Sequence, residues 1–243
     1  MTTLRKEASQ LDERPTVIGL SALACLLFAG LWLGLFIYGL ATAVTVDQFA
    51  TARAYAARLD APFYLTYANA ALVTITATLF MGALYSDMAR RAPLWAAMAV
   101  LFVPAYTVLA LFAYLSQITI VPALLEPQAG PAAQAAADVI LAQLLQVLPG
   151  SAVAMLNNLA YALLGVPSLI FGLLLWQQKR ATSMRRWGGM FLALSGAASI
   201  VGFIGLMLEA GWLSWGSIVG GVLFLAALAA IGLSFLRHSE VHA

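Results

Sequence analysis

Six long runs without a charged residue divide the chain. They cover residues 15–46, 61–86, 92–125, 139–178, 187–208 and 210–236. An α-helix needs about 20 apolar residues to cross the hydrocarbon core of a bilayer, and every run is longer than that. The pattern therefore predicts an all-α fold, a polytopic membrane helical bundle with six transmembrane helices. We place these helices at about residues 17–43, 63–86, 94–119, 151–176, 188–208 and 213–236.

Composition agrees with a membrane domain. Hydrophobic residues make up 63% of the 243 positions and charged residues only 9%, whereas a soluble domain carries about 25% charge. The predicted organisation is a polar tail at 1–16, a six-span membrane domain at 17–236 and a second tail at 237–243. A secretory signal peptide has an apolar core of only about 7–15 residues, so we expect the first span to be retained as an anchor.

The distribution of positive charge predicts the orientation. Ten of the twelve Lys and Arg residues lie in the two tails and in the turns at 87–91 and 179–186, and the other two are Arg53 and Arg58. Because basic residues accumulate on the cytoplasmic side, we expect both termini in the cytoplasm. We interpret the basic turns as topology determinants that meet anionic headgroups, with a specific cytoplasmic partner as the alternative. Five of the six tryptophans then fall at the two membrane interfaces, with Trp95, Trp176 and Trp187 inside and Trp212 and Trp215 outside.

Two connectors on the predicted outer face are amphipathic on a helical wheel. In 47–59, one face carries Phe49, Ala52, Tyr55, Ala56 and Leu59, opposite Asp47, Thr51 and Arg58. In 134–148, one face carries Ile140, Leu141, Leu144, Val147 and Leu148, opposite Asp138, Gln143 and Gln146. Such segments lie in the interface plane or fold over the bundle. The alternative, a seventh span through 132–148, is rejected because it would move the C-terminal basic residues to the outer side.

Residue types that support catalysis or cofactor binding are scarce in the spans. No carboxylate or histidine lies near the centre of a predicted span, and no lysine lies within one, although proton-coupled carriers depend on such groups. The two histidines, His238 and His242, lie in the C-terminal tail. We therefore expect no metal site and no cofactor, and enzymatic activity is disfavoured. The net charge of +2, with the basic residues beside the spans, excludes nucleic acid as a partner and leaves the lipid bilayer.

Strongly polar side chains gather in the predicted outer halves of the spans. They are Tyr38, Tyr64, Tyr67, Asn69, Tyr114, Gln117, Asn157, Asn158, Tyr161 and Glu209. Buried amides must find partners within the protein because lipid offers none. One interpretation is that the amides bond between helices while the tyrosines form an interfacial belt. The other is an outward-facing pocket between the second, third and fourth spans, widened by kinks at Pro104 and Pro167, that holds a small ligand or a lipid headgroup.

Three functions remain open at this point. The first, which we favour, is a non-enzymatic binding protein or accessory subunit of a membrane complex, with a membrane protein or a second copy of the chain as partner. The second is a facilitator of a small neutral solute, which would also need polar residues in the inner halves of the spans. The third is an intramembrane enzyme that acts on lipid, for which Glu209 with Asn157 or Asn158 would supply the polar centre.

Two pairs of glycines lie four residues apart in predicted spans. Small-residue spacings at Gly30–Gly34 and Gly216–Gly220 permit close helix contact, which we assign to packing within the bundle rather than to dimerisation.

The run NNLAYALLGVPS at 157–168, followed by RRWG at 185–188, resembles a group of uncharacterised bacterial multi-span proteins that carry a domain of unknown function. The resemblance covers mainly the fourth to sixth spans. It implies an all-helical protein of the bacterial inner membrane, with no activity and no functional residue attached.

Overall fold

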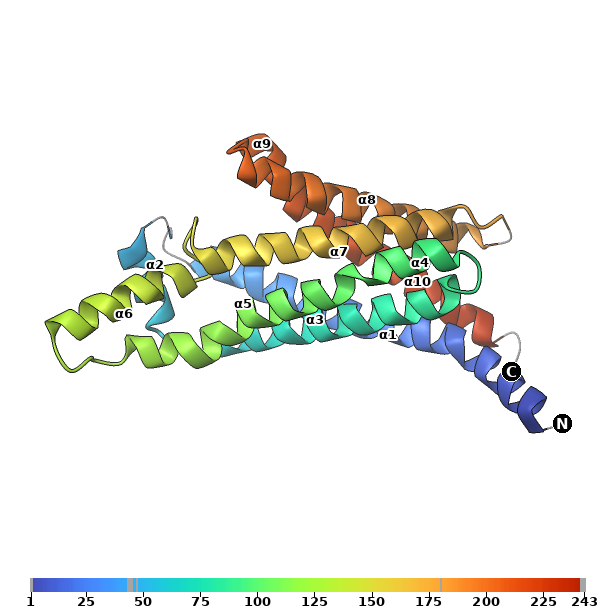
Figure 1. The fold of residues 1–243 in the computed structure, drawn as a ribbon, viewed down its shortest axis with the longest axis horizontal. Helices are drawn as coiled ribbons and strands as arrows, with labels where there is room; N and C mark the ends of the chain where they lie inside the picture. Colours follow the sequence, from blue (N-terminus) through green and yellow to red (C-terminus); the bar gives the residue numbers. More distant parts are fainter. Residues whose placement is uncertain (1, 43–45, 47, 180, 241–243) are drawn as a thin grey trace. The chain divides into compact units, whose positions relative to one another are not determined.

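The computed structural model describes residues 2–42, 46, 48–179 and 181–240, with the side chains of 14–35, 37–38, 46, 48–179 and 181–237. Over this part of the chain it contains helices and no strand (Figure 1), which confirms the predicted all-α fold. The helices are α1 (Thr2–Thr42), α2 (Phe49–Ala56), α3 (Ala61–Met88), α4 (Pro93–Val100), α5 (Phe102–Leu125), α6 (Pro131–Leu144), α7 (Ala152–Trp176), α8 (Ser183–Met207), α9 (Gly211–Ser214) and α10 (Gly216–Glu240). Ala43, Asp47 and the side chains of His238 and His242 lie outside the described residues.

Six segments of the described chain are long and apolar enough to cross a membrane, as the uncharged runs predict. They are Arg14–Leu35, Ala61–Met88, Pro93–Leu125, Ala152–Trp176, Ser183–Met207 and Gly211–Arg237. The first helix differs from the expectation at its start, since α1 begins at Thr2 and takes in most of the predicted N-terminal tail. The chain is therefore an integral membrane protein with a helical membrane domain.

Proline interrupts the third span but not the fourth. α4 ends at Val100 and α5 begins at Phe102, four and two residues before Pro104 respectively. Proline has no amide hydrogen to donate to the carbonyl four residues earlier, and its ring clashes with that carbonyl, which here belongs to Val100. Pro167 also lies inside a helix, but α7 continues past it to Trp176.

The two amphipathic connectors form the short helices α2 and α6. α6 has 14 residues, or about 21 Å at 1.5 Å per residue, and cannot cross a core of about 30 Å. It buries Ala137 and Leu141, whereas Ile140 is 51% exposed. The side of α6 that faces the protein is therefore set by the i, i+4 pair of Ala137 and Leu141, and Ile140 of the predicted apolar face lies outside it. α6 also ends at Leu144, so Val147 and Leu148 continue no helical face.

The chain forms two compact units. Unit 1 comprises Met1–Leu27, Ile75–Tyr106 and Tyr161–Ala243, and unit 2 comprises Phe28–Thr74 and Thr107–Ala160. The helices α1, α3, α5 and α7 each contribute residues to both units. The short connector helices α2 and α6 belong to unit 2, where Arg53 Nε and Asp138 Oδ1 join them at 3.5 Å.

In unit 1, α8 packs closely against both α7 and α10 through small residues. A Cβ atom added at Gly172 of α7 would lie 2.6 Å from the Gly189 oxygen of α8, and one at Gly216 would lie 2.5 Å from the Ala198 oxygen. The Ser195 hydroxyl also donates to the Gly220 carbonyl of α10 at 2.7 Å. The predicted packing role of the Gly216–Gly220 spacing is therefore confirmed.

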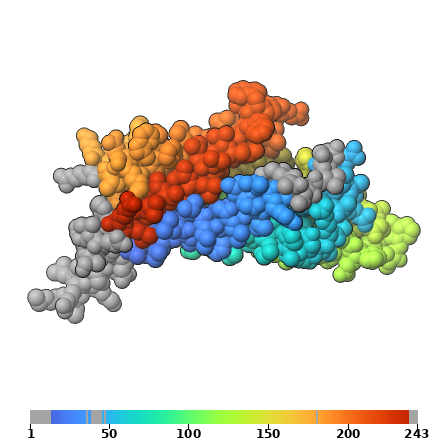
Figure 2. Space-filling view, turned by 180° about the vertical axis from the view of Figure 1, so that it is seen from behind, coloured from blue at the N-terminus to red at the C-terminus, as the bar shows by residue number. Residues whose placement is uncertain are grey.

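The corresponding prediction for Gly30 and Gly34 is wrong within the described part of the chain. A Cβ atom at either position would meet nothing within 4 Å, so this pair brings no described element close to α1. The first part of α1 instead packs through Gly19, in unit 1. Gly19 contacts Leu236, and Leu23 contacts Gly232, so α1 and α10 run antiparallel here (Figure 2).

Large apolar side chains cover the outside of the helices. In unit 1, for example, Leu94 is 70% and Leu101 is 74% exposed. Large apolar side chains are unfavourable on a surface that faces water, whereas they are stable on a surface that faces lipid hydrocarbon. This surface contacts the lipid bilayer.

Close packing of α7 on α8 leads to a first prediction. Gly172→Ala should destabilise the protein by about 1–3 kcal/mol, because the new methyl group would press on backbone atoms of Gly189 and Ala193. Gly82→Ala is the matched control, since nothing lies within 4 Å of its added Cβ and alanine is the better helix former. Thermal unfolding in detergent would compare the two; equal melting temperatures would contradict the close contact.

Candidate functional site

Gln117 joins α5 to the end of α6 in unit 2. Its side chain is fully buried. Nε2 donates to the Leu144 carbonyl at 2.7 Å, and Oε1 accepts from the Gln146 backbone N–H at 3.2 Å. The last carbonyls of a helix lack partners within the helix, so the amide caps α6 from a neighbouring span. For Gln117, the structure agrees with the interpretation that predicted bonds between elements.

The side-chain nitrogen of Asn69 joins α3 to α1, whereas its side-chain oxygen does not. Nδ2 donates to the Phe28 carbonyl at 2.9 Å, and the residue is only 5% exposed. Oδ1 is buried and has no hydrogen-bond partner. The single bond to Phe28 fixes the amide, so this oxygen presents a buried acceptor.

The two adjacent asparagines of α7 behave differently from each other. Asn158 Nδ2 donates to the Ala154 carbonyl of its own helix at 2.8 Å. Asn157 Oδ1 is buried without a hydrogen-bond partner. Among the four predicted amides, Asn69 and Asn157 thus keep unpartnered acceptors, whereas Gln117 is used in packing.

The tyrosines divide between surface and interior. Tyr64 is 37% exposed, as an interfacial belt requires, whereas Tyr67 and Tyr114 are buried. Tyr67 packs edge-on against Phe63, with ring centres 5.0 Å apart, and Phe63 also meets Tyr55 of α2 at 6.1 Å. Burial raises the pKa of the Tyr55 phenol above its usual 10.0, and nearby Arg58 partly offsets the effect. The Tyr55 hydroxyl therefore stays neutral at physiological pH.

Tyr161 and Glu209 belong to unit 1, unlike the other seven predicted site residues. The Tyr161 ring lies 6.4 Å from that of Tyr106. Glu209 is exposed and follows α8 with a φ of 53°. The Glu209 N–H bonds the Leu206 carbonyl, and the next N–H bonds that of Gly205. This Schellman pattern usually places glycine at the left-handed position, so Glu209 serves as a helix stop. A pocket shared by all nine residues stays a prediction.

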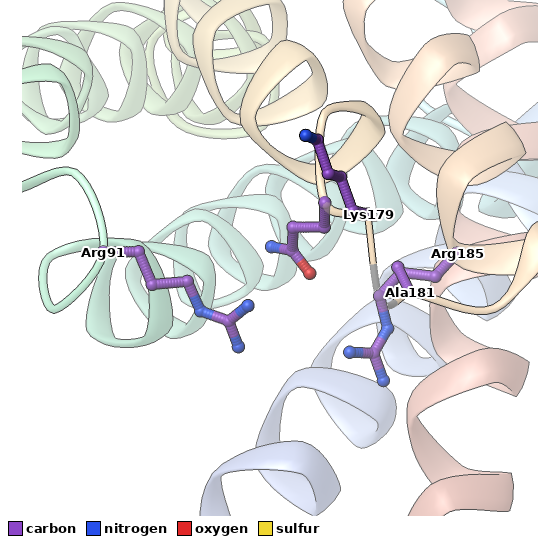
Figure 3. Close-up of a pocket in the computed structure, with 5 residues that line it drawn as sticks. Arg91, Lys179, Ala181 and Arg185 are labelled. Carbon is purple, nitrogen blue, oxygen red and sulfur yellow. The ribbon is translucent and has the colours of Figure 1, made fainter.

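A second polar region lies in unit 1, at the basic turns that the sequence predicts to be topology determinants, with a specific cytoplasmic partner as the alternative. The turn after α3 and the turn between α7 and α8 border an open cavity of about 380 Å³, which is lined by Arg91, Gln178, Lys179, Ala181 and Arg185. The guanidinium groups of Arg91 and Arg185 extend from opposite sides toward the space between them, whereas the Lys179 ammonium points away (Figure 3). The signal in the sequence was the recurrence of arginine in both turns, but burial was not visible there.

Asp87, at the end of α3, organises one wall of this region. It is only 5% exposed, and its Oδ1 pairs with Arg91 at 3.2 Å and with Arg90 at 3.6 Å. The pairs follow i, i+4 and i, i+3 spacing, which places all three side chains on one face. In the described residues, no three His, Cys, Asp or Glu side chains come together as a metal site would need.

The role of Gln117 gives a second prediction. Gln117→Leu should lower the free energy of unfolding by about 1–3 kcal/mol, because Leu144 O and Gln146 N–H would lose their partner. The control is Thr66→Val, which removes a bond between the exposed Thr66 hydroxyl and Pro62 of the same helix and should cost less than about 0.5 kcal/mol. If denaturation in detergent shows no difference between the variants, the capping role is wrong.

Comparison with protein-family models, with curated proteins and with solved structures finds no match to this chain. The resemblance of residues 157–168 and 185–188 to a bacterial multi-span group therefore stays a prediction. The two polar regions described above are the features from which a function is inferred.

Proposed function

We propose that this protein acts by binding rather than by catalysis, as an accessory subunit of a membrane complex. Its polar residues in unit 2 would contribute to an outward-facing site for a small polar ligand or a lipid headgroup. One observation carries the proposal: Asn69 Oδ1 and Asn157 Oδ1 are buried acceptors without hydrogen-bond partners. Both belong to unit 2 and to helices that are candidate spans.

The two unpartnered oxygens are unfavourable for folding unless a donor reaches them. A buried acceptor that loses its water partners costs about 1–3 kcal/mol, and lipid tails supply no donor to replace them. Bonds between helices account for Gln117 and for the nitrogen of Asn69, but they leave these two oxygens unused. A donor on a ligand or a headgroup would satisfy them, which supports a binding function.

The adjacent asparagines allow a matched test. Asn157→Leu should leave thermal stability unchanged or raise it, since it removes an unpartnered acceptor, and should abolish retention of the ligand. Asn158→Leu is the control, because its amide bonds within α7 and its loss should not affect retention. The measurement is mass spectrometry of lipids and small molecules that co-purify from the native membrane, beside a melting curve. Destabilisation by Asn157→Leu with unchanged retention would show a role in packing instead.

We further propose that both termini face the cytoplasm and that the membrane is the bacterial inner membrane. An even number of spans returns the chain to the side on which it began. The antiparallel contact of α1 and α10 through Gly19–Leu236 and Leu23–Gly232 supports this arrangement. The ten-to-two distribution of basic residues supports the cytoplasmic side for the termini.

The orientation has a direct test. A green fluorescent protein fused after Ala243 should fluoresce, because it folds in the cytoplasm, whereas alkaline phosphatase fused there should be inactive, because it needs the periplasm. The reverse result would overturn the proposed topology. A phosphatase fusion at Gln128, in the turn between α5 and α6, is the matched control and should be active.

A further inference from the structure

Arg185 is a charged side chain that the fold buries. It lies in the first turn of α8, where its backbone N–H donates to the Thr182 hydroxyl at 3.3 Å. Its guanidinium carbon lies 3.9 Å from the centre of the Phe235 ring of α10. The residue is only 9% exposed, and its Nε has no hydrogen-bond partner. The ring face compensates part of the cost of burial, and the guanidinium keeps hydrogen-bonding capacity for an anion.

Positive charge exceeds negative charge around this guanidinium. A second cavity, of about 210 Å³, adjoins the first and shares Arg91 and Arg185 with it. The charged residues that line the two cavities are Arg14, Arg90, Arg91, Lys179, Arg185 and Asp87. Five cationic residues and one carboxylate thus line the two cavities, and four cations remain when Lys179, whose ammonium points away, is left out. Asp87 carries a single negative charge, so it offsets at most one of these positive charges, although it pairs with Arg90 and Arg91 and also interacts electrostatically with Arg185.

The arrangement differs from an ordinary basic turn at a membrane surface. Topology determinants need only be exposed, as Arg186 is. The guanidinium of Arg185, its neighbour, instead lies against the Phe235 ring, and that of Arg91 pairs with Asp87. The structure therefore fixes two guanidiniums on opposite sides of one cavity (Figure 3). Such pre-organisation reduces the entropy lost when an anion binds.

The chemistry of the lining favours a phosphate group. Guanidinium groups bind phosphate and carboxylate oxygens in pairs, and a phosphate offers more oxygens and more charge than a carboxylate. The cavity lies where α3 and α7 end and α8 begins. In a membrane, the ends of spans lie at headgroup depth, where basic pockets between helices bind anionic lipid headgroups.

We propose that this cavity binds a phosphate group between the guanidiniums of Arg91 and Arg185, beside the Gln178 amide. The phosphate is carried by an anionic lipid headgroup or is free in solution. The site lies in unit 1 and is independent of the unit 2 residues on which the proposed function rests. If the phosphate site is contradicted, the proposed function of unit 2 therefore still stands, and the reverse is also true.

The test uses the full chain in a maltoside detergent, which contains no phosphate. Calorimetric titration with inorganic phosphate and with dioctanoyl phosphatidic acid measures the two sources separately. Dioctanoylglycerol, which has the same acyl chains without the phosphate, and chloride at equal ionic strength are the negative controls. Binding of phosphatidic acid alone would identify a lipid headgroup, and binding of both would show that free phosphate suffices. Binding of neither would overturn the proposal.

Variants then locate the site. Arg185→Gln and Arg91→Gln should each weaken phosphate affinity about tenfold or more, the usual effect of removing a charge-assisted hydrogen bond. Arg186→Gln removes the same charge from the exposed neighbouring position and should change affinity by less than about twofold. Equal losses in Arg186→Gln and Arg185→Gln would show attraction to general surface charge and would contradict the site.

Two variants keep the test decisive if Arg185→Gln does not fold. Arg91 has a side chain that is 49% exposed, and its removal leaves Asp87 paired with Arg90. Arg91→Gln therefore tests the site even if Arg185→Gln does not fold. Arg185→Lys retains the charge but not the planar fork, so it should fold and bind more weakly than the unaltered protein. Unchanged affinity in Arg91→Gln would overturn the proposal.

Discussion

Hydrocarbon offers no hydrogen-bond partner to a polar group, and this constraint decides most of what the structure does. It confines the six spans to helices, whose backbone groups pair within the helix. It also decides where side-chain amides go. Gln117 lies fully buried because the end of α6 needs partners that a span can supply. Where the helix must break inside a span, at Leu101, the break follows from a proline that cannot donate.

The fold was largely predictable because charge is so unevenly distributed along the chain. Every uncharged run overlaps one candidate span, and the boundaries of 151–176 agree with α7 within one residue. Departures arise where local geometry overrides the pattern. Ile140 appears on the apolar side of a helical wheel, but α6 turns Ala137 and Leu141 inward. Similarly, Gly30 and Gly34 have the spacing of a contact site without a neighbour in the described chain, since spacing does not specify a partner.

The polar regions were less predictable, because their roles depend on contacts between distant residues. The sequence gives no basis for distinguishing Asn157 from Asn158. In the structure, however, the Asn158 amide donates a hydrogen bond within α7, whereas Asn157 Oδ1 has no hydrogen-bond partner. The carboxylate of Glu209 suggested a functional residue, but Glu209 has a left-handed backbone conformation that ends α8. Arg185 could not be distinguished from Arg186 by any pattern, since its burial depends on a ring in another helix. Pairings of this kind are encoded by tertiary packing alone.

The contact between Arg185 and Phe235 also bears on how the protein is made. Phe235 is the fiftieth residue after Arg185 in the chain, so α8 leaves the ribosome well before its aromatic cover exists. The ring can cover the guanidinium only after α10 has been made and has packed against the small-residue face of α8 through Gly216 and Gly220. Enclosure of the charge at Arg185 thus depends on a helix that is synthesised later.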